Sequence, residues 1–211
     1  AMHSAANYLS KMGWDNKIGW GAPVKIEKSN KKAWSYVNSN DWEPESVFRS
    51  LGVKTLDGKL VKNSDNMASL VAPQGVEGPT FIVYNNFKYI MNWNASTNYA
   101  LSVGMLSDAI VSDSIPLFER PENWDKAPLM TTNQVKKIQE KLASLELYDA
   151  KVTGLYGKKT MRAIKKYQKM LIDGDEEVSP TGKEITTYKS GNPIIPDGYP
   201  SFDLYEQMFG K

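Results

Sequence analysis

The sequence predicts an α+β fold for residues 1–111 and a small helical module for residues 127–211. Two observations predict this division. In the first part, stretches with the period-two alternation of strands lie between stretches of helical periodicity, whereas only helical periodicity recurs in the last part. Between them, residues 112–128 carry three prolines and several acidic residues, a composition typical of linkers. We place the linker at 112–126.

Composition narrows the classes of function. The chain has 211 residues and a formal net charge of +2, so no strong field for nucleic acid is expected. It has no cysteine, which excludes disulfides, thiol nucleophiles and cysteine-ligated zinc. Its one histidine, His3, allows neither a histidine-based triad nor a multi-histidine metal site. No cofactor is expected, and no apolar run approaches the ~20 residues that span a bilayer.

The first residues predict an amphipathic helix. Ala5, Tyr8, Leu9 and Met12 recur at helical spacing, and Gly13 stands where a glycine commonly ends a helix. The stretch lacks the basic start and long apolar core of a signal peptide. Because no capping residue precedes this helix, we expect the chain to be a piece of a longer protein.

Short elements are predicted in the middle of the first part. Residues 23–27 and 68–72 have strand-like patterns, and residues 44–52 begin with proline and end with glycine, as a short helix does. Residues 80–84 and 87–91 are predicted to pair as a hairpin, because asparagines between them accept the left-handed conformation that tight turns need.

A polar junction precedes the next predicted helix. Ser96 or Thr97 can cap the first turn of this helix, and Asn94 can stabilise the turn before it. The helix is predicted by an apolar stripe at helical spacing, formed by Tyr99, Val103, Leu106 and Ile110.

The last part begins with a capping box at residues 131–134. A helical stripe follows it, consisting of Val135, Ile138, Leu142 and Leu145. Gly154 and Gly157 bracket a tight loop, and both are expected because the loop needs positive φ. The acidic run 173–177 lacks the spacing of an EF-hand loop, so we expect a solvated segment and no metal site.

Spaced motifs in the last part match a known module. Residues 138–142 form an Ile-Gln-x-x-Leu seam, residues 152–157 form a Gly-x-Tyr-Gly loop, and a helix runs to Tyr167 and Gln168. Residues 127–211 thereby resemble the peptidoglycan-binding domain of bacterial wall hydrolases, with an insertion at about 170–195. The resemblance implies a three-helix module that binds the wall polymer. Its candidate binding residues are Tyr156, Gly157, Tyr167 and Gln168, although a core role is the favoured interpretation of the two tyrosines.

Three motifs in the first part point to a second family. Residues 4–14 read SAANYLSKMGW, and Pro-Val follows at 23–24. Asn-Phe at 86–87 then opens an apolar stretch that ends in WNASTNYA at 93–100. Together these motifs resemble the C-terminal half of the lytic murein transglycosylase B family, a branch of the lysozyme-like superfamily. The resemblance implies a lysozyme-like fragment with a small antiparallel β-hairpin sheet. One departure is Trp93, where that family usually has tyrosine.

The resemblance also implies an activity and a site. The family cleaves the bond between N-acetylmuramic acid and N-acetylglucosamine without water and leaves a 1,6-anhydro product. By this resemblance, Trp93, Asn94 and Tyr99, together with Asn7 and Tyr8, line a glycan-binding cleft. Aromatic rings cover the apolar faces of sugars, and asparagine offers both a donor and an acceptor to an N-acetyl group.

The catalytic acid of that family has no clear counterpart in this sequence. One glutamate acts first as general acid and then as general base, and it begins a Glu-Ser/Thr-x-x-Gly motif upstream of the Ala-Asn-Tyr helix. Here only Glu45 precedes a hydroxyl residue, and Arg49 stands where the glycine should be. The preceding Pro44 predicts a helix start at the surface. We therefore expect the catalytic glutamate upstream of Ala1 and expect this chain alone to be inactive.

Two functions from different classes remain open. The first is the substrate-binding and wall-binding part of a lytic transglycosylase, partnered by peptidoglycan glycan strands and by the N-terminal catalytic portion of the same protein. The alternative is a non-catalytic peptidoglycan-binding protein. An encoded Glu-Ser/Thr-x-x-Gly helix upstream would favour the first. Both resemblances imply the periplasm, with association to the outer membrane through an upstream segment left open.

Overall fold

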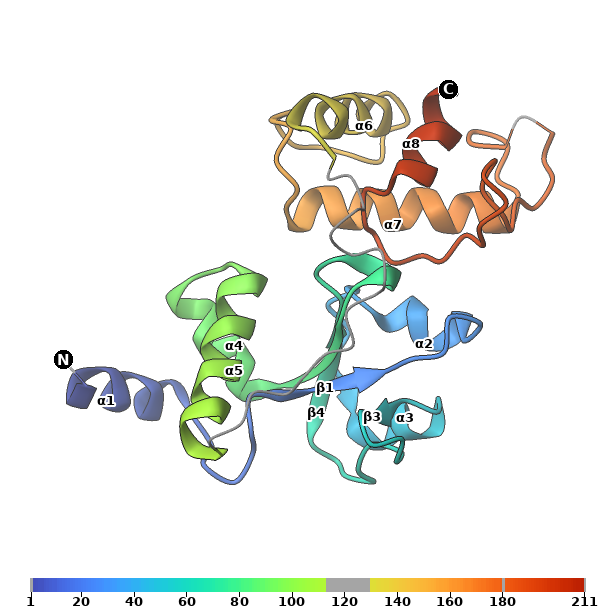
Figure 1. The fold of residues 1–211 in the computed structure, drawn as a ribbon. Coiled ribbons are helices and arrows are strands. Elements are labelled where there is room, and N and C mark those ends of the chain that lie inside the picture. The colour runs from blue at the N-terminus through green and yellow to red at the C-terminus, as the bar shows by residue number, and fades with distance from the viewer. Residues whose placement is uncertain (1, 113–129, 180, 211) are drawn as a thin grey trace. The chain divides into compact units, whose positions relative to one another are not determined.

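The computed structural model describes residues 2–112, 130–179 and 181–210. The chain divides into two compact units, residues 1–120 and 121–211 (Figure 1). Apart from Ser112, the linker predicted at 112–126 lies outside the described residues.

Five short strands form one antiparallel sheet in the first unit, in the order β2-β4-β5-β1-β3. Their bounds are β1 Gly21–Lys25, β2 Glu43–Pro44, β3 Lys54–Thr55, β4 Met67–Val71 and β5 Thr80–Tyr84. The apolar run of β5 suits its place at the centre of the sheet, because Phe81, Ile82 and Val83 are all buried there. The α+β prediction is confirmed, and the strands predicted at 23–27, 68–72 and 80–84 are present.

The hairpin predicted at 80–91 is wrong in its second arm. Residues Asn85–Trp93 form helix α4, and β5 pairs instead with β4 and β1. Phe87 and Ile90 are buried at helical spacing and pack in a core cluster with Trp20. The asparagines taken as a turn therefore misled the prediction, because a helical pattern begins at the same residues.

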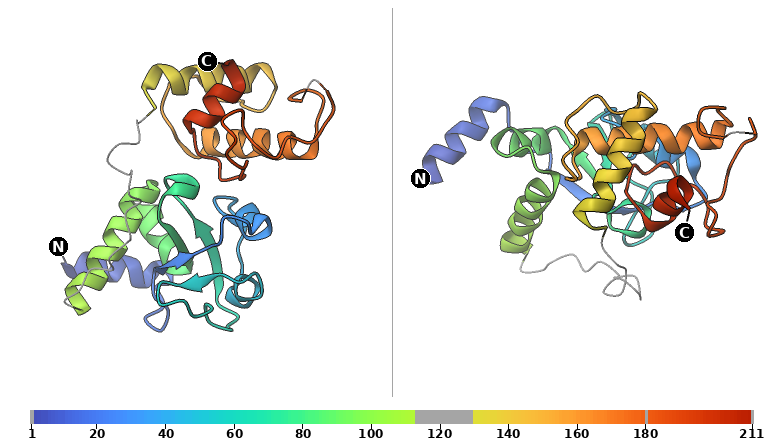
Figure 2. Two further views of the ribbon diagram at one scale, coloured as in Figure 1. Left: turned by 45° about the vertical axis from the view of Figure 1, so that its right-hand side comes forward. Right: turned by 90° about the horizontal axis from the view of Figure 1, so that it is seen from above.

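Helix α1, Met2–Met12, ends at Gly13 with a φ of 100°, as expected from the sequence. It extends away from the rest of the first unit (Figures 1 and 2). None of residues 3–12 is buried, and Tyr8 and Leu9 are half-buried. The remaining helices of this unit are α2 Lys31–Tyr36, α3 Glu45–Ser50, the 3-10 turn Gly75–Glu77 and α5 Thr97–Ser112.

Helix α5 has the predicted position, but its predicted core face is wrong. Leu106 and Ile110 are 62% and 73% exposed, whereas Ala100, Leu101 and Gly104 form the buried face. The small residue Gly104 allows the helix to approach Trp20, since a Cβ there would lie 2.3 Å from Trp20 Cδ2. Trp20 Nε1 also donates a hydrogen bond to Asp108 Oδ2 at 2.8 Å. Close approach to Trp20 thus selects the buried face of α5.

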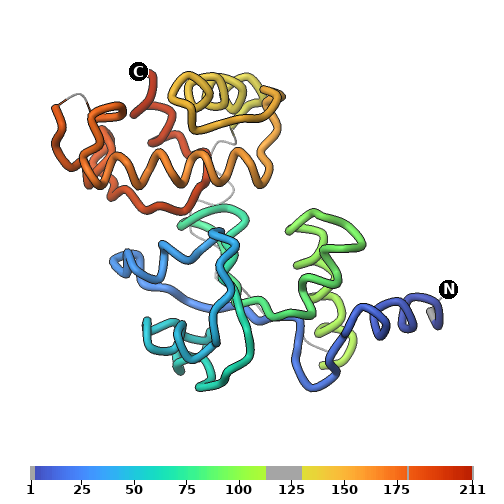
Figure 3. The backbone as a smooth tube through the Cα atoms, turned by 180° about the vertical axis from the view of Figure 1, so that it is seen from behind, coloured from blue at the N-terminus to red at the C-terminus, as the bar shows by residue number. Residues whose placement is uncertain are grey.

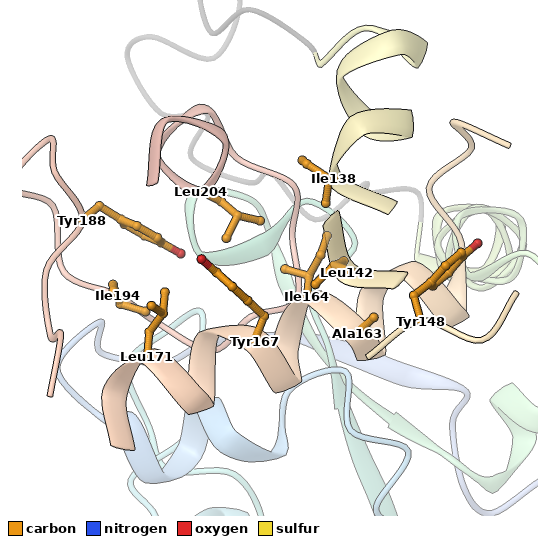
Figure 4. Close-up of a cluster of buried hydrophobic side chains, with 10 residues drawn as sticks. All are labelled: Ile138, Leu142, Tyr148, Ala163, Ile164, Tyr167, Leu171, Tyr188, Ile194 and Leu204. Atoms are coloured by element: carbon orange, nitrogen blue, oxygen red, sulfur yellow. The ribbon is translucent and has the colours of Figure 1, made fainter. Parts of the chain in front are cut away.

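The described part of the second unit contains three helices, α6 Thr132–Ser144, α7 Lys158–Asp173 and α8 Phe202–Phe209. Thr131 caps α6, and the capping box with Gln134 is confirmed. Ile138, Leu142, Ile164 and Leu204 are fully buried in one core between the helices (Figure 4).

The insertion predicted at about 170–195 begins within α7 and continues as an irregular path toward α8 (Figure 3). It contributes more to the core than its polar sequence indicates. Tyr188 and Ile194 are 7% and 1% exposed and pack in the same core as the three helices (Figure 4).

Candidate functional site

The polar junction between α4 and α5 is built by two local hydrogen bonds. Asn94 Oδ1 accepts the backbone N–H of Ser96 at 3.0 Å, and Ser96 Oγ accepts that of Tyr99 at 3.3 Å. The expected turn at Asn94 and the expected cap at Ser96 are therefore confirmed. These bonds fix the backbone where the chain changes direction, and Asn94 remains exposed.

An aromatic pair lies beside this junction, with Trp93 exposed and Tyr8 half-buried. The Tyr8 ring of α1 meets the Trp93 ring of α4 edge to face, with centroids 5.4 Å apart and planes at 82°. Trp93 is nevertheless 62% exposed, and Tyr99 is 38% exposed. A tryptophan so exposed contributes little to a core, whereas its ring is free to cover the apolar face of a sugar.

The structure thus brings together two of the predicted glycan-site residues from opposite ends of the first unit's sequence, Tyr8 and Trp93. Asn94 follows Trp93 directly along the chain, and Tyr99 comes six residues after Trp93, in the first turn of α5. Asn7 is exposed on α1, and within residues 2–112 no hydrogen bond or ring contact joins it to the pair. We define the candidate glycan site as Tyr8, Trp93, Asn94 and Tyr99, with Asn7 at its edge.

Glu45 lies elsewhere, and the prediction that it starts a surface helix is wrong. It does begin α3, but it is only 2% exposed. Its carboxylate accepts hydrogen bonds from the Lys62 backbone at 3.1 Å, Ser64 Oγ at 2.7 Å and the Tyr84 hydroxyl at 2.8 Å. Burial raises the pKa of Tyr84 well above its ordinary value, and the hydrogen bond to Glu45 adds to this shift. A carboxylate enclosed in this way joins α3 to the sheet and is not placed to reach a surface glycan.

In the second unit, two of the candidate wall-binding residues lie in the core. Tyr167 and Gln168 are 4% and 1% exposed. Burial raises the pKa of Tyr167 to about 12. Gln168 donates to Tyr188 Oη and Asp197 Oδ1, both at 3.0 Å, and accepts from the Gly198 backbone at 2.9 Å. These two side chains therefore stabilise the core of the module and are not exposed for binding at its surface.

The loop before α7 contains the other two candidates. Tyr156 is half-buried: its hydroxyl donates to Gly198 O at 3.1 Å, and its ring meets Tyr199 at 5.7 Å. Gly154 has the expected positive φ of 75°, but the same expectation for Gly157 is wrong, because Gly157 is extended at a φ of −139° as the N-cap residue of α7. Leu155 between them is 70% exposed, a feature that sequence analysis did not single out.

Sequence analysis also missed the role of Gln139. It is fully buried: its Oε1 accepts the backbone N–H groups of Thr153 and Gly154, and its Nε2 donates to Leu155 O and Thr160 Oγ1. Its amide thus fixes the loop before α7, as the amide of Gln168 fixes the loop before α8. The sequence contains a signal for these two roles: each of two helices carries a glutamine, and a loop containing glycine and tyrosine follows each helix.

Over the described parts of the chain, no cluster of three or more histidine, aspartate and glutamate side chains is arranged to hold a metal ion. None of the helices described there has the length and apolar character needed to cross a membrane.

Comparison with known families agrees with both resemblances. Residues 1–108 match the transglycosylase SLT domain, and residues 131–171 match a peptidoglycan binding domain. The chain therefore belongs to the SLT-domain transglycosylase family and carries a peptidoglycan-binding module after it. Both assignments connect the chain to the metabolism of peptidoglycan.

Two solved structures of SltB3 from Pseudomonas aeruginosa are similar to this chain, one in complex with NAG-anhNAM-pentapeptide and the other with NAG-NAM-pentapeptide. Each is 27% identical, with a TM-score of 0.73 over 97% of this chain and 48% of the SltB3 chain. The chain thus spans about half the length of these relatives. No curated protein matches it.

Proposed function

We propose that the chain supplies the glycan-binding and wall-binding parts of a peptidoglycan lytic transglycosylase. Such an enzyme cleaves the bond from N-acetylmuramic acid to N-acetylglucosamine without water and leaves 1,6-anhydro-N-acetylmuramic acid ends. The observation that carries the proposal is the ring contact of Tyr8 with the exposed Trp93, which Asn94 follows directly and Tyr99 follows on the next helix. Membership of the transglycosylase family and the glycan-peptide complexes of SltB3 support it.

Each residue of the candidate glycan site has a distinct role in this proposal. The rings of Trp93, Tyr8 and Tyr99 cover apolar faces of the aminosugars. The Asn94 Oδ1 atom already accepts the Ser96 N–H, so its amide nitrogen is the group left to donate to an N-acetyl carbonyl. Asn7 adds a second amide at the edge of the site.

The catalytic acid is proposed to lie upstream of Ala1, where the resembled family has its Glu-Ser/Thr-x-x-Gly motif. The reaction needs a carboxyl group that protonates the leaving oxygen and then accepts the proton of the attacking hydroxyl. Glu45 is enclosed by three donors, and the exposed Glu27 and Glu77 pair with lysines. Together with the order of the family's motifs, this enclosure supports our proposal that this chain alone binds glycan but does not cleave it.

The second unit is proposed to bind the wall polymer through the surface of the loop before α7. Leu155 is its most exposed apolar side chain, and Gly157 is exposed beside it. The Tyr156 hydroxyl anchors the loop by donating a hydrogen bond to Gly198 O. Action on peptidoglycan places the protein outside the cytoplasm. We propose that it works in the periplasm and that a further segment attaches it to the outer membrane.

The test is to incubate the purified chain with sacculi, measure the bound fraction by sedimentation, and search the soluble fraction for 1,6-anhydromuropeptides by mass spectrometry. We expect binding without release. Release of anhydro products would show that a carboxyl group of this chain does the chemistry, and lack of binding would contradict the proposal outright.

Matched variants assign the binding to the candidate glycan site. Binding of a soluble glycan fragment to the chain should weaken in Trp93→Ala and stay unchanged in Leu106→Ala, because both side chains are 62% exposed but only Trp93 lies in the site.

The second candidate function, a non-catalytic peptidoglycan-binding protein, is favoured by the enclosure of Glu45. Sequencing the gene upstream of Ala1 separates the two functions. A Glu-Ser/Thr-x-x-Gly helix encoded there supports the enzyme, and its absence from the full reading frame supports the binder.

A further inference from the structure

We propose that Asn86 is a positioning residue for the candidate glycan site: it fixes α1, which carries Tyr8, against α4, which carries Trp93. This inference rests on the proposed function. Asn86 itself is only 1% exposed and does not belong to the site.

The geometry of Asn86 is that of a clamp between two segments far apart in sequence. Its Oδ1 accepts the backbone N–H of Asp15 at 3.0 Å. Its Nδ2 donates to Asp15 O at 2.8 Å and Ile18 O at 2.5 Å. The side chain at the start of α4 therefore holds both backbone groups of Asp15 and the turn that follows α1. Because this buried amide makes all of these hydrogen bonds, it holds the turn in one conformation.

Helix α1 depends on this clamp because little else holds it. None of residues 3–12 is buried, and the helix extends away from the unit (Figure 2). Two other features locate its end: Trp14 packs against the core of the unit, and a Cβ added to Gly13 would lie 2.9 Å from the Tyr89 hydroxyl. Along α1 itself, the ring of Tyr8 contacts the ring of Trp93.

The ring pair lies some distance from the clamp along both helices. Tyr8 precedes Asp15 by seven residues, and Trp93 follows Asn86 by seven. Along α4 this separation is about 10 Å at the helical rise of ~1.5 Å per residue, and Tyr8 lies four residues before the end of α1, so both arms are on the order of 10 Å. A rotation of α1 by ~10° about the clamp would move the Tyr8 ring by ~2 Å, enough to break an aromatic contact at ordinary ring separation. The hydrogen bonds of Asn86 therefore set the spacing of the two rings that the site offers to a sugar.

The test uses Asn86→Asp, which keeps the acceptor for Asp15 N–H but sets an oxygen against the carbonyls of Asp15 and Ile18. Asn38→Asp is the matched control. Asn38 is also buried, accepts from Ala72 N at 3.0 Å and donates to Ala72 O at 2.9 Å, but it lies at the edge of the sheet away from α1. Asn86→Ala is the milder second variant if the aspartate prevents folding, because no carboxylate then faces the carbonyls.

Two measurements read out the result. The chain has no cysteine, so Lys11→Cys and Ser107→Cys, both on exposed positions of α1 and α5, allow spin labels whose distance distribution reports the position of α1. Affinity for a soluble N-acetylglucosamine–N-acetylmuramic acid fragment is measured in parallel. Asn86→Asp should broaden the distance distribution and weaken binding about tenfold, the loss expected when one ordinary contact is no longer made. Asn38→Asp should change neither quantity, although both variants lower the melting temperature.

An unchanged distance distribution in a folded Asn86 variant would overturn the inference, and so would a broadened distribution with unchanged affinity. A parent chain that binds no glycan would instead overturn the proposed function and the affinity part of this inference. The label distances would then still decide whether Asn86 fixes α1.

Discussion

Removing the carboxylate of Glu45 should destabilise the first unit without changing glycan binding. Glu45→Ala leaves three donors without their acceptor: the Lys62 backbone, Ser64 Oγ and the Tyr84 hydroxyl. Hydrogen bonds to a charged group contribute about 1.5 kcal/mol or more each when one partner is removed. Because Ser64 and Tyr84 are only half-buried and can regain water, we expect a total loss of about 3–5 kcal/mol rather than a larger sum.

The assay is urea unfolding of the whole chain, followed by tryptophan fluorescence. All of the described tryptophans lie in the first unit, so the signal reports mainly on that unit. Glu45→Gln is the conservative variant. It keeps one acceptor oxygen but sets an amide N–H against a donor, so its loss should be smaller. Glu77→Gln is the control, because Glu77 pairs with Lys28 at the surface and such pairs contribute at most about 1 kcal/mol.

The reasoning fails if Glu45→Gln leaves stability intact. It also fails if the variant abolishes cleavage by an enzyme form that contains the chain. The first result would mean that the three hydrogen bonds contribute nothing net. The second would return Glu45 to the position of catalytic acid, against its enclosed geometry.

Three further predictions concern the site, the loop before α7 and alkaline pH. Asn94→Ala should weaken glycan binding and cost about 1 kcal/mol of stability through its lost turn contact; a sharp fall in melting temperature with unchanged binding would make Asn94 structural. Gly154→Ala should lower the melting temperature of the second unit, because φ is 75° and the new Cβ would lie 2.5 Å from a backbone oxygen, whereas Gly157→Ala should not, since its φ is −139° and no atom lies within 4 Å. The folded-state pKa of Tyr167, about 12, lies above the ordinary value of 10.0. The unfolded chain therefore releases this proton first, so the stabilisation is complete below pH ~10 and lost as pH rises toward ~12. In Tyr167→Phe that loss should shrink in unfolding curves measured from pH 9 to pH 12, and an identical pH dependence in both proteins would contradict the assignment.

The sequence predicted local chemistry well where neighbours along the chain decide it. The cap at Ser96, the turn at Asn94 and the capping box at Thr131 all depend on atoms within three residues of one another. Family motifs likewise identified both units, because such motifs are short and contiguous.

Long-range partners explain the failures. The donors to Glu45 come from 17, 19 and 39 residues away, so its neighbours Pro44 and Ser46 could not indicate burial. The hairpin prediction failed because Asn86, taken as a turn residue, is bonded to segments about 70 residues earlier in the chain. The face of α5 was mistaken because hydrophobicity favoured Leu106, whereas close packing on Trp20 required Gly104.

The aromatic pair of the candidate glycan site illustrates the same limit. Sequence resemblance named Tyr8 and Trp93 separately, as members of one predicted cleft. Their contact depends on the packing of two helices between which all the strands of the sheet lie in the sequence. No local sequence pattern specifies that packing.

The two glutamine amides of the second unit also bear on the order in which that unit assembles. Gln139 joins groups 14 to 21 residues away, whereas Gln168 bonds Tyr188 across 20 residues and also reaches 29 and 30 residues to Asp197 and Gly198. Doubling a closed loop raises its entropic barrier by only about 0.6 kcal/mol, but nearer contacts still form first. Helices α6 and α7 with their loop should therefore make the early folding nucleus, and α8 should join last. Lengthening the segment between α7 and α8 should then slow the final step of folding while leaving the nucleus untouched.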